Sequence, residues 1–238
     1  KIFSAAEIQA IKAEIKIHIE SELKIAYETG TMEVDTEEEI NDVYAKSIVN
    51  SQWLLDNSSP TYEITAATEK KFIHAVSEGL RQSMQQHSNL ILMGQDIAEY
   101  GGAFKVTEGF VEQFGKERVR NTPICESAIV GAALGLSLQG FKAMMEMQFA
   151  DFATVGFNQI INNLAKIHYR WGQNADVVIR MPTGGGVGAG PFHSQSNEAW
   201  FAHTPGLKVV YPSSPMDAKG LLIAAINDPN PVLFFEHK

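Results

Sequence analysis

The sequence has a single cysteine, fewer basic than acidic residues and no long apolar run, and each shortage excludes a class of protein. Cys125 alone cannot form a disulfide within the chain or a metal site built on several thiolates, and it fits a reducing compartment. No apolar run is long enough to span a membrane, and we find no signal or transit peptide. Lys and Arg form no dense cluster, which argues against nucleic acid as a partner.

The negative charge is concentrated in the first quarter of the chain. The formal net charge is −9, of which residues 1–60 carry −7 and residues 61–238 only −2. We therefore expect two different kinds of segment. The sequence begins at Lys1 without a methionine and ends at Lys238 directly after a strand-like run, so we interpret both ends as cuts in a longer polypeptide.

The first segment is predicted to be a long helix over residues 4–29, followed later by a linker. Ser4 and Glu7 have the spacing of a capping box, and Gly30 closes the helix. One apolar stripe follows helical spacing: Ile8, Ile11, Ile15, Ile19, Leu23 and Tyr27. A single helix with such a stripe cannot fold alone, so we expect its partner elsewhere in a longer protein. Asn, Ser and Pro predict a linker at residues 51–67.

From residue 68 onward, short and continuously apolar runs alternate with helical segments. The expected strands are residues 90–94, 142–147, 177–181, 207–211 and 232–236. The expected helices are residues 68–86, 108–114, 127–139, 151–170, 197–203 and 216–227. Strands of this type are typical of a parallel sheet with both faces covered. We predict an α/β fold, a three-layer sandwich with a mainly parallel sheet, plus an N-terminal helical extension.

The loops at the carboxyl ends of these strands are the expected site of chemistry. Glu126 stands at the start of a helix rich in small residues, where burial would raise its pKa and make it a proton donor. The alternative is that Glu126 only complements the helix dipole. His193 follows a glycine-rich loop beside Phe192 and is a candidate acid or base.

Three other kinds of site find no support. Residues 184–189 fit G-x-G-x-x-A, but Pro191 interrupts before any helix can begin, so the loop is not a dinucleotide fingerprint. It is either a mobile excursion over a pocket or a plain turn-rich connection. The histidines form no H-x-x-x-H pair, which argues against a catalytic zinc, and neither Ser127 nor Ser194 lies in a G-x-S-x-G elbow.

Four stretches of residues 68–238 occur in the order found in one known family. They read NTPICESAIVGAALGLSLQGFKAMMEMQFADF, the loop ending in FHSQS, EAWFAHTPGLKVVYPSSPMDAKGLL, and DPNPVLFFEHK. Together they resemble the beta subunit of thiamine-diphosphate-dependent 2-oxo acid dehydrogenases. The resemblance implies that subunit's pyrimidine-binding domain, with a transketolase-like fold, and the carboxyl-terminal domain that normally follows is missing. Residues 1–45 resemble the last helices and tail of the alpha subunit. This implies a helical domain at residues 1–50 and a parent protein with alpha and beta fused.

The resemblance also implies a cofactor, thiamine diphosphate, and the residues around it. Glu126 would hydrogen-bond a nitrogen of the aminopyrimidine ring, and Ile124, Gln148 and Phe152 would line the pocket of that ring. His193 would stabilise intermediates and help transfer the acyl group to lipoyl-lysine. Many relatives have Tyr where Phe152 stands, so a hydroxyl contact is absent at this position.

Metal ions are implied in two places. The diphosphate and its magnesium are held in the family by the alpha subunit, through a GDG motif followed by NN, and neither motif occurs here. We therefore expect this chain alone to be inactive and to bind the cofactor weakly. Some relatives hold a structural potassium ion, and the matching positions are Ala175, Val177, Val178, Ala225, Asp228 and Asn230. The alternative there is an ordinary sheet edge with a DPNP turn.

Gln95 stands where relatives often have Glu, which leaves its role open.

The implied activity is oxidative decarboxylation of a 2-oxo acid, with acyl transfer to lipoyl-lysine. HSQSNEAWFAHTPGLKVV and FFEHK favour a branched-chain substrate over pyruvate. The alternatives are a non-catalytic interface domain and a transketolase-like enzyme. The implied partners are an alpha-subunit region, a lipoyl acyltransferase core and a further copy in a two-fold oligomer, without nucleic acid or membrane. The implied location is the bacterial cytoplasm, or the mitochondrial matrix in a eukaryote.

Overall fold

The computed structural model describes residues 3–46 and 69–238, and the predicted linker at residues 51–67 lies outside them. The chain divides into two compact units, Lys1–Ile40 and Asn41–Lys238. None of the helices in the described ranges has both the length and the apolar character needed to cross a membrane.

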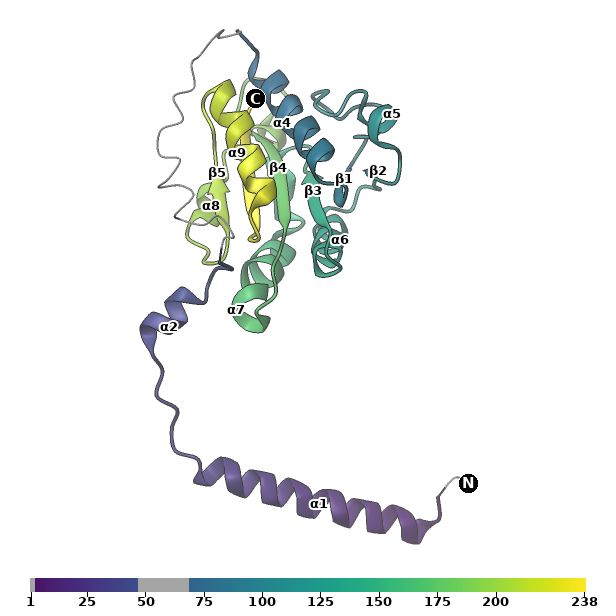
Figure 1. Cartoon of the computed structure of the whole chain (residues 1–238), viewed down its shortest axis with the longest axis vertical. Helices are drawn as coiled ribbons and strands as arrows, with labels where there is room; N and C mark the ends of the chain where they lie inside the picture. The colour runs from purple at the N-terminus through teal and green to yellow at the C-terminus, as the bar shows by residue number, and fades with distance from the viewer. Residues whose placement is uncertain (1–2, 47–68) are drawn as a thin grey trace. The chain divides into compact units, whose positions relative to one another are not determined.

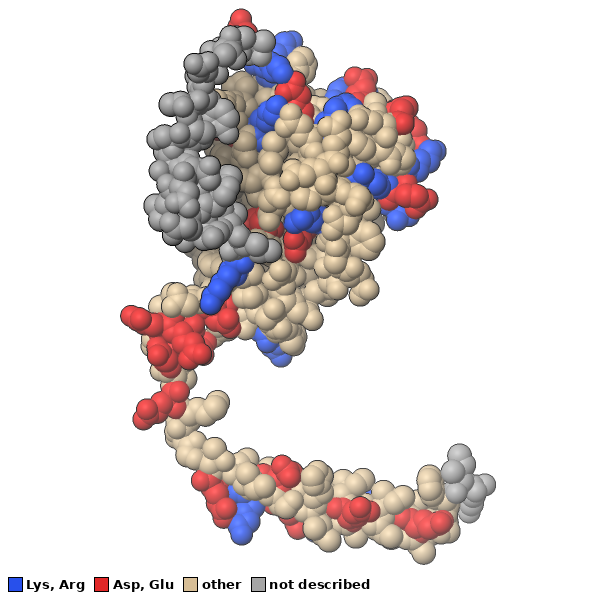
Figure 2. Space-filling model, viewed as in Figure 1, with Lys and Arg blue, Asp and Glu red and all other residues tan. Residues whose placement is uncertain are grey.

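The first unit is built on one helix, α1 (Ala5–Glu28), drawn in purple in Figure 1. The predicted capping box is confirmed: the Ser4 hydroxyl accepts from the Glu7 N–H, and the Glu7 carboxylate accepts from the Ser4 N–H at 2.7 Å. No residue of α1 is buried in the described structure, so its isoleucine stripe faces solvent. The short helix α2 (Thr36–Asn41) has three glutamates in its first turn, which form part of the acidic cluster in Figure 2.

Six strands of the described residues form one sheet in the order β2-β1-β3-β4-β6-β5, and every neighbouring pair is parallel. The strands are β1 (Leu90–Gly94), β2 (Val119–Asn121), β3 (Lys142–Glu146), β4 (Val177–Thr183), β5 (Lys208–Val210) and β6 (Val232–His237). The predicted parallel sheet is therefore confirmed. Its central strands are buried along nearly their whole length because helices cover both faces.

Two apolar cores lie on opposite faces of the sheet. Successive strand residues alternate between them, as Met144 and Met145 do. One core packs against α4 (Phe72–Gln86) and α9 (Pro215–Asn227), which lie side by side in Figure 1. The other packs against α6 (Glu126–Leu138) and the short helices that follow β3. The predicted three-layer α/β fold is thus confirmed.

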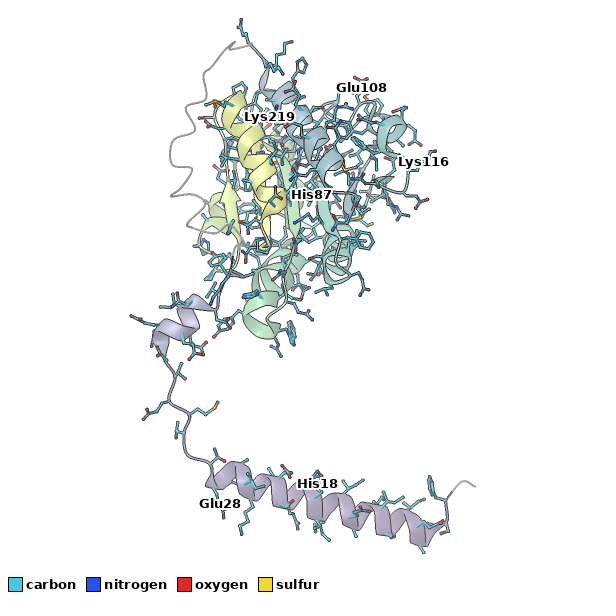
Figure 3. All side chains as sticks on the ribbon, in the orientation of Figure 1. His18, Glu28, His87, Glu108, Lys116 and Lys219 are labelled. Atoms are coloured by element: carbon cyan, nitrogen blue, oxygen red, sulfur yellow. The ribbon has the colours of Figure 1, made fainter. Side chains whose placement is uncertain are left out.

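Close contact between α4 and α9 depends on a glycine. A Cβ at Gly79 would lie 3.2 Å from the backbone carbonyl oxygen of Lys219, so the two backbones approach more closely than a larger residue would allow. Lys219, labelled on α9 in Figure 3, donates to the Glu78 carboxylate on α4 at 3.3 Å. The remaining helices of the described residues are short. They are α5 (Phe110–Phe114), α7 (Ile167–Trp171), α8 (Ala199–Ala202), η1 (Ala150–Thr154), η2 (Gln159–Asn163), η3 (Leu164–Lys166) and η4 (Pro191–His193).

The helix expected at residues 151–170 is a broken path of four short helices: η1, η2, η3 and α7. The path passes close to α6 at Gly156, where a Cβ would lie 3.3 Å from the Val130 side chain. Packing against α6 takes precedence over regular helical hydrogen bonding here, because the Thr, Val and Asn residues of the segment have weak helix propensity. Likewise, a 3₁₀ turn, η4, ends at His193, where the sequence predicted no helical structure.

Candidate functional site

Glu126 is a buried carboxyl group at the first residue of α6, immediately after the N-cap residue Cys125. Its side chain is 7% exposed, and its Oε1 accepts a hydrogen bond from the Gln95 Nε2 at 3.2 Å. Gln95 follows β1 directly and is equally buried. Glu126 is therefore more than an exposed helix-end carboxylate, and Gln95, whose role the sequence left open, is its hydrogen-bond partner.

His193 lies in an aromatic cluster at the carboxyl end of the sheet. Its ring stands edge-on to Phe149, with centroids 4.9 Å apart, and to Phe152, with centroids 5.4 Å apart. Phe104, in the loop after β1, extends the cluster through an edge contact with Phe149. The His193 Nδ1 is buried and has no hydrogen-bond partner in the described residues. An unpaired buried nitrogen of this kind is costly unless a ligand or water satisfies it.

Lys238 closes the cluster from the end of β6. Its ammonium group donates to the backbone carbonyl oxygen of His193 and lies 4.7 Å from the centre of the Phe149 ring. Burial lowers the pKa of Lys238, which the nearby Asp151 carboxylate partly opposes. A cavity of about 310 Å³ lies beside these groups, and Phe104, Val106 and Lys238 are among its lining residues. Its volume is at the lower limit for a small-ligand pocket.

The predicted catalytic and cofactor-binding residues lie at the carboxyl edge of the sheet, but they are not all in contact. Phe152 meets His193 in the aromatic cluster, and Gln148 is half-buried at the end of β3. Ile124 is 82% exposed. No hydrogen bond or ring contact in the described residues joins Glu126 to His193.

Comparisons with known proteins agree with this geometry. Residues 69–238 match the family described as "Transketolase, pyrimidine binding domain". The chain belongs to this family.

The pyrimidine-binding domain has several relatives of high identity. It is 50% identical over 169 residues to the 2-oxoisovalerate dehydrogenase subunit beta of Bacillus subtilis, covering 70% of this chain and 52% of that protein. The pyruvate dehydrogenase E1 component subunit beta of the same organism is 44% identical over 167 residues, covering 69% of this chain and 51% of the relative. A mitochondrial 2-oxoisovalerate dehydrogenase subunit beta of Dictyostelium discoideum is 45% identical over 185 residues, covering 75% of this chain and 50% of that protein. The chain thus spans about half the length of these relatives.

One solved structure is similar to this chain in fold, and its low identity allows no conclusion beyond the fold. A chain described as "Split gene transketolase, inactive beta4 tetramer" superposes with a TM-score of 0.55 at 21% identity, covering 69% of this chain and 50% of that one. The transketolase-like fold and the resemblance to the beta subunit are therefore confirmed, while the alpha-subunit tail stays a prediction.

The pyrimidine-binding domain also contains a buried ion cluster that the sequence analysis missed. Arg180 in β4 donates to both carboxylate oxygens of Glu236 in β6, each at 2.6 Å, and to Glu146 in β3 at 2.7 Å. All three side chains are buried. Burial raises the pKa of Glu146, and the charge of Glu236 adds to this, although Arg180 acts in the opposite direction. A charged residue inside an otherwise apolar strand was the available signal, since such residues are rarely buried unless paired.

The positions expected to hold potassium surround the turn before β6. The Ala225 carbonyl oxygen accepts from the Asp228 N–H, and Asp228 accepts from both the backbone and the side chain of Asn230 at 2.9 Å. The other Asp228 oxygen pairs with the Lys208 ammonium group, and Asn230 exchanges two hydrogen bonds with the Ala45 backbone. The backbone positions Ala175, Val177 and Val178 lie at the start of β4. The Asp228 and Asn230 side-chain oxygens thus accept hydrogen bonds from protein groups in the described structure. Potassium stays a prediction.

Proposed function

We propose that this chain is the pyrimidine-binding part of a 2-oxo acid dehydrogenase that oxidatively decarboxylates its substrate with thiamine diphosphate and passes the acyl group to lipoyl-lysine. The observation that supports the proposal best is the buried Glu126 carboxyl group, paired with Gln95 at the carboxyl edge of a parallel sheet. The names of the relatives support the reaction class, since they are beta subunits of 2-oxoisovalerate and pyruvate dehydrogenases.

The residues present fit the pyrimidine half of thiamine diphosphate. A flat heterocycle with polar nitrogens requires a buried hydrogen-bonding group at its edge and apolar groups against its faces. Glu126 supplies the first, and Ile124 and Phe152 supply apolar surface that is only partly covered in the chain itself. Gln148, half-buried at the end of β3, adds an amide at the same edge of the sheet. When bound, thiamine diphosphate supplies the electron sink that decarboxylation of a 2-oxo acid requires.

Each side chain has a distinct part in this reaction. The Glu126 carboxyl group holds a proton at a ring nitrogen of the cofactor, and the Gln95 amide fixes its orientation. The free Nδ1 of His193 hydrogen-bonds an oxygen of the substrate or acyl group. The rings of Phe149 and Phe152 hold the imidazole and exclude water from it.

Other parts of the protein complete the enzyme in this proposal. We propose domains at residues 1–50 and 68–238, joined by the linker, in a parent protein whose alpha-subunit region binds the diphosphate and magnesium. The assembly is two-fold and docks to a lipoyl acyltransferase core, in the bacterial cytoplasm or the mitochondrial matrix. This chain alone is inactive. A branched-chain substrate is favoured over pyruvate, in line with the 50% and 44% identities to the two Bacillus subtilis relatives.

The experiment compares wild type with Glu126→Gln in the full-length enzyme, supplied with thiamine diphosphate and magnesium. We expect decarboxylation to fall by about 10²-fold or more, because glutamine cannot hold the proton, while the melting temperature stays the same. Glu108→Gln is the matched control, since Glu108 is exposed on the surface (Figure 3). Faster turnover of 3-methyl-2-oxobutanoate than of pyruvate by wild type would support the branched-chain substrate. Undiminished turnover of Glu126→Gln would contradict the proposal and favour a non-catalytic interface domain.

A further inference from the structure

Asp151 is a buried carboxylate that the proposed mechanism does not use. It is the second residue of η1, five residues after the end of β3 in the segment that also carries Phe149 and Phe152, and it is 5% exposed. Its Oδ1 accepts two hydrogen bonds from Gln195: one from the backbone N–H at 3.1 Å and one from the side-chain Nε2 at 3.0 Å. Its Oδ2 has no partner in the described residues. A buried carboxyl group is costly unless its oxygens are hydrogen-bonded, so the two hydrogen bonds to Oδ1 are the contacts that hold Asp151 in place.

Gln195 is the point at which the glycine-rich loop returns to the sheet. Its carbonyl oxygen accepts from the Thr183 hydroxyl at 3.1 Å and from the Gly184 N–H at 2.9 Å, both at the end of β4. Its N–H is the group that Asp151 binds. Both backbone polar groups of Gln195 are therefore held, one by β4 and the other by η1. Two residues further on, the Asn197 side chain donates to the Ala150 carbonyl oxygen at 2.7 Å and adds a second link to η1.

His193 lies two residues before this attachment point. Its ring is placed by edge contacts with Phe149 and Phe152, which flank Asp151 in sequence. No carboxylate in the described residues hydrogen-bonds the imidazole itself, so nothing orients His193 through its ring nitrogens. The position of the imidazole therefore depends on how firmly its backbone is held against η1. Asp151 is the residue of η1 that holds it, with the Lys238 contact to the His193 carbonyl oxygen on the other side.

We propose that Asp151 is a positioning residue that fixes the His193 imidazole against Phe149 and Phe152 by anchoring the backbone at Gln195. The inference rests on the proposed function in one respect only: it takes His193 as the group that contacts the substrate. Asp151 acts through the placement of its Oδ1 rather than through its charge. Asparagine can accept the same two hydrogen bonds, whereas alanine can accept neither.

Two variants separate placement from charge. In the full-length enzyme we expect Asp151→Ala to lower kcat by about 10²-fold, because a misplacement of about 1 Å has an effect of that size. We expect KM to stay unchanged and Asp151→Asn to restore kcat to within about threefold of wild type. Asp176→Ala is the structural control. Asp176 is a half-buried carboxylate paired with Lys142 at 2.8 Å. Lys142 begins β3 and Asp176 directly precedes β4, so the pair lies at the edge of the sheet opposite to His193.

An NMR measurement on this chain tests the placement without any activity. The imidazole C–H signals of His193 are assigned by their loss in His193→Ala, and ring currents of Phe149 and Phe152 shift them. We expect Asp151→Ala to move these signals toward the values of an exposed histidine, while Asp151→Asn and Asp176→Ala leave them in place. Unmoved signals in Asp151→Ala would overturn the proposal, as would equal losses of kcat in the Ala and Asn variants. Full turnover in His193→Ala would instead contradict the proposed function, and the NMR result would still decide the placement.

Discussion

Replacing Glu146 by glutamine tests how the buried ion cluster shares its protons. Arg180 is one cation between two carboxylates, and it donates two hydrogen bonds to Glu236 but one to Glu146. Burial and the charge of Glu236 raise the pKa of Glu146 above its ordinary value of 4.5. The folded chain therefore holds a proton on Glu146 up to a higher pH than the unfolded chain does. Glutamine has nearly the same shape, accepts the same hydrogen bond from Arg180 and carries no charge, so Glu146→Gln imitates the protonated state.

The expected effect has a definite sign. Because the pKa of Glu146 is higher in the folded than in the unfolded chain, the folded chain binds more protons between the two pKa values. The free energy of unfolding then falls as the pH rises from about 4.5 through that window, by about 1.4 kcal/mol per pH unit for one proton. The free energy of unfolding of Glu146→Gln does not fall in this way, because glutamine binds no proton in this pH range. Its stability relative to wild type should therefore rise with pH across the window.

Urea unfolding, followed by circular dichroism at several values between about pH 5 and pH 8, measures the difference. Glu236→Gln serves as the contrast, because it removes the partner that binds Arg180 through two oxygens. Removing one partner of a buried pair costs about 3–5 kcal/mol, so we expect this variant to be strongly destabilised at every pH. Parallel pH profiles for wild type and Glu146→Gln would refute the assignment of the proton. A loss in Glu146→Gln as large as that in Glu236→Gln would refute it as well.

Two further predictions concern stability and use urea unfolding with a matched control. Gly206→Ala should lower the free energy of unfolding by about 3–5 kcal/mol, because the φ of Gly206 is +91° and a Cβ would lie 1.8 Å from the Ala165 carbonyl oxygen. Gly220 lies on an open face of α9, so Gly220→Ala should instead raise the free energy of unfolding by about 0.5–1 kcal/mol. Arg118→Met should cost about 2–4 kcal/mol, because the guanidinium group donates to three backbone carbonyls between the end of α4 and the start of β1. Arg118 lies in the turn just before β2, and Arg120→Met, at an exposed position of β2, should change stability by about 0.5 kcal/mol or less. Equal effects within either pair would contradict the reasoning.

The sheet could be predicted because its signal is local. A strand covered on both faces is apolar at every position, and residues 90–94 show this so clearly that the prediction matches β1 at both ends. Glu126 could be singled out for a similar reason, since a carboxylate before a small-residue helix is visible in the sequence. The edge strand β2 gave no such signal, because two of its three residues are exposed.

The rest depends on contacts between segments distant in sequence. The broken path after β3 follows from the close approach of Gly156 to α6, which no helical periodicity reveals. Arg180 finds its carboxylates 34 and 56 residues away, and Asp151 finds Gln195 44 residues away. Partners of this kind are set by strand order and loop path. A charge within an apolar run indicates only that a partner exists, not which residue it is.

The single thiol has a practical consequence for studying the site. Cys125 is the residue immediately before Glu126, is half-buried at the N-cap of α6, and is the one cysteine of the sequence. A thiol-directed reagent therefore modifies one defined atom, without any prior removal of competing cysteines. The rate of that modification reports whether the site is occupied, since a ligand or partner that covers Ile124 and Glu126 would slow it. The chain thus contains a built-in reporter one residue from its buried carboxyl group.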